Sequence, residues 1–164
     1  EIDRSRISEY ASLKPNAVYK EGCSGIWSIP CDVAMPCATQ NEISLEAAKM
    51  LCNNGTMALL EGANMPCTLD ALEVFSQEDI LYVPAKAANA GGVAVSGLEM
   101  AQNAGRASWS YEKVDQKLQD IMRSIFDQCL EVAQKYGSPG NLLLGANIAG
   151  FEKVSKAMQW QGVI

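Results

Sequence analysis

The first half of the chain alternates short apolar runs with segments of helical spacing. Each run is typical of a strand buried on both faces of a parallel sheet. The three runs are residues 31–37, 56–61 and 80–84. The two predicted helices between them span residues 45–53, after Ser44, and residues 69–77, after Thr68. Because serine and threonine cap first helical turns, this order predicts an α/β fold with a parallel sheet of about three strands.

The second half of the chain is predicted to be helical. Its clearest segment is residues 111–135, where apolar side chains recur at helical steps and form one stripe. A last helix is predicted from about Asn147, and the side chains expected on its buried face are Ile148, Phe151, Val154 and Met158. Further helices are predicted at residues 3–12 and 98–109, and Gly55 is expected to end the 45–53 helix.

Composition indicates a single folded domain. The chain has 164 residues, of which 48% are hydrophobic and 20% are charged, which argues against disorder. Its net charge of −6 makes nucleic acids and anionic membrane surfaces poor partners, and we expect neither. Histidine is absent, which excludes Ser-His-Asp and Cys-His catalysis within this chain and any zinc site that needs an imidazole. No metal is expected.

The cysteines leave two interpretations open. No pair of the 6 has C-x-x-C spacing, so neither a zinc knuckle nor a thioredoxin-like redox pair is supported. Several lie among apolar neighbours, where a reduced cysteine acts as a small hydrophobic side chain. The alternative is three disulfides. Because the sequence contains no signal peptide and no run of about 18 apolar residues, we expect a cytoplasmic location and no membrane span.

Polar residues follow each predicted strand, at the edge of a parallel sheet where ligands bind. The three segments are residues 36–42, 61–66 and 85–92. Each combines small residues, which let a ligand approach the backbone, with amide or hydroxyl side chains that can hydrogen-bond a carboxamide or a ribose. Turn formation is the simpler explanation of any single segment. The three together predict one polar binding rim.

Phosphate-binding signatures are missing from these segments. Residues 92–97 have the glycine spacing of a P-loop, but the lysine and serine or threonine that must follow are absent. Ser96 precedes the predicted 98–109 helix, where its hydroxyl would either bind a carboxylate ligand at the helix N-terminus or simply cap the helix. Lys86 is either an anion partner or general base, or a solvated surface lysine.

Several motifs in and beyond these segments are long, ungapped and ordered. They are CDVAMPCATQNE at 31–42, EGANMP at 61–66, KAANAGGVAVSGLEMAQN at 86–103, GANIAGF at 145–151 and QGVI at 161–164. They resemble the C-terminal part of microbial NADP-type glutamate dehydrogenases, and the likeness covers residues 30–164.

The resemblance implies a partial Rossmann-like domain whose cofactor is NADP rather than NAD. By matching position, Ala38 and Thr39 would line the nicotinamide side of the cleft, and Asn64 would contact the nicotinamide ribose or amide. The family's catalytic lysine and aspartate and its glycine-rich phosphate turn belong to segments upstream of residue 1, so no catalytic residue is expected here. Because the chain also begins at Glu1 without methionine, we expect a fragment that is inactive alone.

The same resemblance implies an oxidoreductase that interconverts L-glutamate and 2-oxoglutarate plus ammonia, as a homohexamer. Asn89 and Val93 would lie near the substrate, and Ser96 would hydrogen-bond its side-chain carboxylate. We expect residues 1–96 to form the second half of the cofactor domain and residues 97–164 a helical segment that packs toward the N-terminal domain. Two alternatives stay open: a related branched-chain or aromatic amino acid dehydrogenase, and a non-catalytic nucleotide-binding module.

Overall fold

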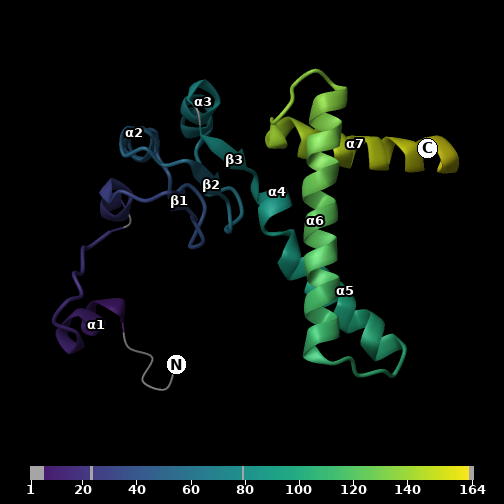
Figure 1. Cartoon of the computed structure of the whole chain (residues 1–164), viewed down its shortest axis with the longest axis horizontal. Coiled ribbons are helices and arrows are strands. Elements are labelled where there is room, and N and C mark those ends of the chain that lie inside the picture. Colours follow the sequence, from purple (N-terminus) through teal and green to yellow (C-terminus); the bar gives the residue numbers. More distant parts are fainter. Residues whose placement is uncertain (1–5, 23, 79, 163–164) are drawn as a thin grey trace.

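Within residues 6–22, 24–78 and 80–162, which the computed structural model describes, the fold centres on a three-stranded parallel sheet of order β1-β2-β3 (Figure 1). The strands are β1 (Val33–Ala34), β2 (Ala58–Leu60) and β3 (Leu81–Val83), and the crossover helices are α2 (Leu45–Asn53) and α3 (Leu69–Gln77). The predicted α/β class, partial Rossmann-like sheet and parallel strand direction are confirmed. The strands are shorter than the apolar runs that predicted them.

Local capping explains why α2 and α3 have the predicted bounds. The Ser44 Oγ accepts a hydrogen bond from the Ala47 N–H at 3.3 Å. The Thr68 Oγ1 accepts one from the Ala71 N–H at 3.4 Å. After α2, Gly55 adopts a φ of 76°, and backbone hydrogen bonds of 3.0 and 3.1 Å return to the last helical turn as a Schellman motif. Glycine takes this conformation without steric cost, so the predicted end of α2 is confirmed.

Side chains from the sheet and its crossovers form one core. Leu59, at the centre of β2, is fully buried and is in register with Ala34 of β1 and Tyr82 of β3. The other buried members are Trp27, Ile43, Ala47, Ala48, Leu51, Cys67, Ala71 and Phe75. The prediction that β1 is buried on both faces is wrong, because Val33 and Met35 are 48% and 59% exposed. Among the described strands β1 pairs with β2 alone, so it is an edge strand.

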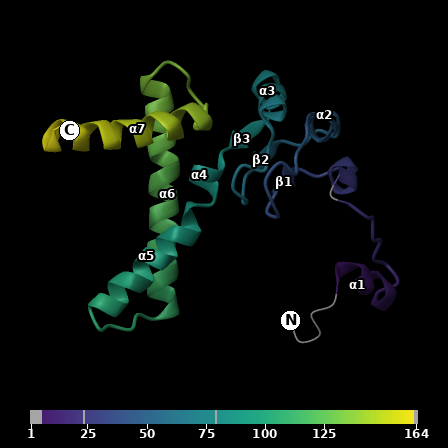
Figure 2. The same cartoon turned by 180° about the vertical axis from the view of Figure 1, so that it is seen from behind.

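A helical part follows the sheet. Its elements are α4 (Ala85–Ala88), α5 (Ala90–Ala104), α6 (Tyr111–Lys135) and α7 (Leu142–Gln161). Figures 1 and 2 show α5 beside the N-terminal half of α6 and α7 crossing its C-terminal half. The predicted bounds of the 111–135 helix are confirmed, and its stripe buries Cys129, Val132 and Ala133.

Two of these helices begin earlier than the sequence predicts. The helix expected at 98–109 is α5, which begins at Ala90 and ends at Ala104. The helix expected from Asn147 is α7, which begins at Leu142. Both predicted starts are therefore wrong.

Local contacts set both starts. The Asn141 Oδ1 accepts a hydrogen bond from the Leu144 N–H at 2.9 Å and caps α7, and α5 begins at Ala90, directly after Asn89 at the end of α4.

A Cβ on Gly145 of α7 would overlap the carbonyl oxygen of Cys129, and a Cβ on Gly91 of α5 would lie 3.4 Å from the Met122 Sδ. Glycine costs a helix roughly 1 kcal/mol relative to alanine. At Gly145 the missing side chain lets α6 approach, and the packing gained offsets that cost, whereas at Gly91 a Cβ would be in ordinary van der Waals contact.

The apolar face of α7 is more exposed than predicted. Phe151, Val154 and Met158 are 71%, 60% and 45% exposed, and Ile148 is half-buried. Near its start α7 buries Leu142 and Gly145 against α6, whereas Figure 1 shows its C-terminal half extending beyond α6. The predicted buried face of this helix is therefore wrong.

The N-terminal segment precedes the sheet as α1 (Ile7–Leu13) and the 3-10 helix η1 (Ser24–Ser28). α1 overlaps the helix predicted at 3–12, whose residues 3–5 lie outside the described residues. It buries none of its side chains, and Figure 1 shows it apart from the sheet.

The described cysteines are free thiols. They are Cys31, Cys37, Cys52, Cys67 and Cys129, and Cys23 lies outside the described residues. The alternative of three disulfides is therefore wrong. Across the described parts of the chain, no helix has the length and apolar character needed to cross a membrane.

Candidate functional site

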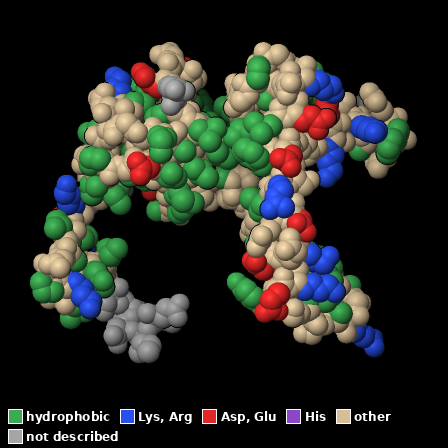
Figure 3. Space-filling model, in the orientation of Figure 1, with side chains coloured by type: hydrophobic (Ala, Val, Ile, Leu, Met, Phe, Trp, Pro, Cys, Tyr) green, Lys and Arg blue, Asp and Glu red, His purple; other side chains and the backbone are tan. Residues whose placement is uncertain are grey.

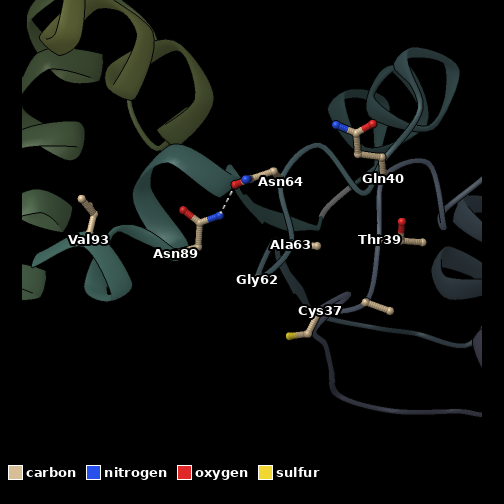
Figure 4. A pocket seen from close by; sticks show the side chains of 9 residues that line it. Cys37, Thr39, Gln40, Gly62, Ala63, Asn64, Asn89 and Val93 are labelled. Atoms are coloured by element: carbon tan, nitrogen blue, oxygen red, sulfur yellow. Dashed lines mark hydrogen bonds between the residues drawn. The ribbon is translucent and has the colours of Figure 1, made fainter. Parts of the chain in front are cut away.

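The three polar segments that follow the strands meet at one open pocket of about 580 Å³. It is lined by Cys37, Ala38, Thr39, Gln40, Gly62, Ala63, Asn64, Asn89 and Val93. Figure 4 shows Thr39 and Gln40 on one side and Asn89 and Val93 on the other, with the glycine-containing segment after β2 between them. Five of the six predicted site residues thus lie at one place. Their individual roles stay predictions.

Asn64 and Asn89 form a direct pair across the pocket. The Asn89 Nδ2 donates to the Asn64 Oδ1 at 2.8 Å (Figure 4). Each amide has one carbonyl oxygen and one NH₂ group, so the bond leaves one group of each amide wholly unpaired with the other. Asn64 keeps its NH₂ donor and Asn89 keeps its carbonyl acceptor. This donor and acceptor match the two ends of a primary carboxamide.

Backbone hydrogen bonds hold the first two segments together. The N–H groups of Gly62 and Ala63 both donate to the carbonyl oxygen of Pro36, at 3.0 and 2.9 Å. A Cβ on Gly62 would overlap the Cys37 Sγ, so a larger residue there would require the Cys37 side chain to move. The relative position of the two segments is therefore determined by the main chain.

Two buried glutamates accept hydrogen bonds from the main chain of these segments. Glu42 is 8% exposed, and its Oε1 accepts a hydrogen bond from the Ala38 N–H at 3.1 Å. Glu61 is 4% exposed, and its Oε2 accepts one from the Ala85 N–H at 2.8 Å. Sequence reasoning missed both residues. The sequence signal that could have identified Glu61 is an acidic residue directly after an apolar run, since Glu61 directly follows β2.

Glu61 lines a second cavity with Cys67, Tyr82 and Lys86. Burial first, and hydrogen bonding to Glu61 second, raise the pKa of the Cys67 thiol and of the Tyr82 hydroxyl far above their usual values. Both groups therefore keep their protons at neutral pH. Glu61 therefore shares this cavity with two neutral groups and with Lys86.

Ser96 lies elsewhere than predicted. It is exposed within α5, where its Oγ donates to the Gly92 carbonyl oxygen at 3.3 Å, and it does not line the pocket. The predicted position at a helix N-terminus is wrong because α5 begins at Ala90. Asn89, Val93 and Ser96 follow helical spacing, so Ser96 lies one turn beyond Val93 on the same face.

Lys86 joins two helices. Its side chain is exposed, and its Nζ donates to the Asn147 Oδ1 of α7. Because Lys86 lies on α4 and does not line the pocket, this contact connects α4 to α7. The surface interpretation of Lys86 fits the structure better than the interpretation as a general base.

The pocket lining carries no formal charge among the described residues. Its polar groups are two paired amides, a third amide on Gln40 and the Thr39 hydroxyl, with Val93 as an apolar side chain. Such a lining suits a flat ring with a carboxamide and hydroxyl groups, because neutral donors and acceptors bind these groups without adding charge.

Comparison with known proteins identifies similar sequences and structures. The sequence model of the Glutamate/Leucine/Phenylalanine/Valine dehydrogenase family matches residues 1–162. The chain is 54% identical over 159 residues to the NADP-specific glutamate dehydrogenase of Escherichia coli, covering 97% of this chain and 35% of that protein. It is 50% identical over 169 residues to the NADP-specific glutamate dehydrogenase of Helicobacter pylori, covering 99% and 38% respectively.

Solved structures agree with this likeness. A crystal structure of Plasmodium falciparum glutamate dehydrogenase superposes with a TM-score of 0.93 at 48% identity, covering 100% of this chain and 35% of that one. A hetero-hexameric glutamate dehydrogenase from Thermus thermophilus, at 19% identity and a TM-score of 0.80, shares the fold. The chain therefore spans little more than a third of the length of these curated relatives.

Proposed function

This chain belongs to the Glutamate/Leucine/Phenylalanine/Valine dehydrogenase family, and from that membership we propose that the protein carrying it interconverts L-glutamate and 2-oxoglutarate plus ammonia with NADP. The observation that carries the proposal is the uncharged pocket where three strand-following segments meet around the Asn64–Asn89 pair. The similarity of the chain to NADP-specific glutamate dehydrogenases favours glutamate over branched-chain or aromatic substrates, and NADP over NAD.

The residues present fit the nicotinamide end of such a cofactor. Ala38 and Thr39 would lie beside the ring, and the free NH₂ group of Asn64 would donate to the carboxamide or the ribose. When bound, the nicotinamide gives or accepts a hydride. The part this chain plays is to orient the ring, while Asn89 and Val93 lie on the substrate side of the pocket.

A direct assay tests the function. The full-length protein should oxidise NADPH when supplied with 2-oxoglutarate and ammonium, and should do so more slowly with NADH. Oxidation of leucine or phenylalanine instead of glutamate would move the protein to the alternative amino acid dehydrogenases. Tight NADPH binding by residues 1–164 alone, without turnover in the full-length protein, would favour the non-catalytic nucleotide-binding module.

Ser96→Ala tests the proposed contact to the substrate carboxylate. A hydrogen bond to a charged group contributes about 1.5 kcal/mol at the lower end of its range, so KM for 2-oxoglutarate should rise roughly tenfold with kcat nearly unchanged. Ser124→Ala, at an exposed serine of α6, is the matched control and should leave KM unaltered. An unchanged KM in Ser96→Ala removes Ser96 from the substrate site.

Cys37 offers a test that needs no turnover. Its thiol is exposed in the pocket, whereas Cys67 and Cys129 are buried, and burial raises the pKa of both buried thiols. Iodoacetamide should therefore modify Cys37 first. NADPH at about ten times its Kd should slow that modification roughly tenfold by occupying the pocket. Peptide mass spectrometry measures each site, with Cys31 as the unprotected control. Equal rates with and without NADPH would contradict binding beside Cys37.

We further propose that residues 97–164 pack toward the part of the protein that this chain lacks. The exposed apolar side chains of Phe151 and Val154 on α7 support this. Figure 3 shows a separate group of hydrophobic side chains over the sheet-bearing part. The proposed division after residue 96 falls within α5, which is continuous there. A cytoplasmic location fits the free thiols. A homohexamer is the proposed assembly, and native mass spectrometry of the full-length protein would test it.

A further inference from the structure

Glu61 is placed to organise the pocket without lining it. It directly follows β2, it is 4% exposed, and its Oε2 accepts the Ala85 N–H at 2.8 Å. Ala85 is the first residue of α4, and the N–H of a first helical residue has no partner inside its helix. The Glu61 carboxylate therefore satisfies the N-terminus of α4 from the neighbouring strand.

Two hydrogen bonds join the segments 61–64 and 85–89 at both ends. The Glu61–Ala85 bond closes the end inside the fold, and the Asn89–Asn64 bond, also 2.8 Å, closes the end at the pocket. With the covalent chain between them, these bonds form a closed ring. Because the two segments are joined at both ends, the Asn64 and Asn89 amides have little freedom to separate. The position of Glu61 therefore affects how these two amides meet.

We propose that Glu61 is a positioning residue, whose carboxylate holds the start of α4 so that Asn89 stays within hydrogen-bonding reach of Asn64 and the amide pair faces the pocket. For its effect on cofactor binding the proposal rests on the proposed function. The ring itself does not depend on that function.

Four variants of the full-length protein test the ring. Glu61→Ala removes the acceptor, and Glu61→Gln keeps an acceptor oxygen of the same reach. Ala85→Pro removes the donor instead, because proline has no N–H. Proline is tolerated at a first helical position, and the φ of −68° and ψ of 153° at Pro84 suit a residue that precedes proline. Thr56→Val is the matched control, since Thr56 is 3% exposed and lies just before β2, at its opposite end.

NADPH titration should show the Kd rising roughly tenfold or more in Glu61→Ala and in Ala85→Pro, the change expected from losing a charge-assisted hydrogen bond. The double variant that combines Glu61→Ala with Ala85→Pro should bind NADPH no more weakly than either single variant, because both changes break the same hydrogen bond. Glu61→Gln should stay within a few-fold of the unmodified protein. An unchanged Kd in both single variants, or an equal loss in Thr56→Val, would overturn the proposal.

Hydrogen exchange separates this inference from the proposed function. Amides of residues 86–89 should exchange faster in Glu61→Ala and Ala85→Pro and at the original rate in Thr56→Val and Glu61→Gln, whether or not the protein binds NADPH. Unchanged exchange in Glu61→Ala would overturn the positioning role. A protein that neither binds NADPH nor turns over glutamate, but shows the exchange difference, would refute the proposed function and leave the ring established.

Discussion

Leu59→Ala is expected to lower the free energy of unfolding by about 4 kcal/mol, the largest effect of any change considered. Leu59 is fully buried in the central strand, between Ala34 of β1 and Tyr82 of β3. Truncation removes its transfer free energy and leaves a cavity that β1 and β3 can fill only in part. Urea denaturation followed by circular dichroism measures the loss.

The matched control for this change is Met57→Ala, immediately before the same strand. Met57 is 62% exposed, so its truncation should cost less than about 0.5 kcal/mol. Equal losses in the two variants would show that the sheet does not form the core of this part of the protein.

Gly145→Ala is expected to cost about 3 kcal/mol, at the upper end of the range for overpacking. The added Cβ would overlap the Cys129 carbonyl oxygen, and both atoms belong to rigid helical backbone, so α7 must move away from α6. That movement would also disturb Leu142, which is 2% exposed beside the same crossing. Thermal unfolding of the variant should show a correspondingly lower Tm.

Gly150→Ala is the control on the same helix and should have the opposite sign. A Cβ on Gly150 meets nothing within 4 Å, so the substitution should stabilise α7 by roughly 0.5–1 kcal/mol through helix propensity. Because the substitution is the same at positions 145 and 150, comparing the two stabilities separates the effect of close packing from the effect of helix propensity. A destabilised Gly150→Ala, or a neutral Gly145→Ala, would contradict the observed helix crossing.

Sequence patterns predicted elements well wherever local signals and tertiary contacts agree. The helices 45–53 and 69–77 have the predicted bounds, because Ser44 and Thr68 cap them from within a few residues. The helix at 111–135 was equally clear, since its stripe repeats over many turns. In each case neighbouring residues supply the information that decides the structure.

Predictions were wrong where the deciding atoms lie far away in sequence. The close approach of α7 to α6 depends on Gly145, where a Cβ would overlap the Cys129 carbonyl oxygen. The position of Ser96 was wrong because its expected helix N-terminus lies inside α5, which begins at Ala90. The exposure of Phe151 and of Val33 likewise depends on what covers a helix or an edge strand, which periodicity does not report.

The order of strands and helices along the chain was enough to predict the parallel α/β class and the convergence of Thr39, Asn64 and Asn89, since parallel strands bring the residues that follow them to one edge. The hydrogen bonds between Asn64 and Asn89 and between Glu61 and Ala85 could be found in the folded structure alone. These contacts join residues 25 and 24 positions apart, and their formation depends on the register of β2 against β3 to within a single residue. Local sequence carries the side-chain types, whereas strand register and helix crossing determine which of them meet.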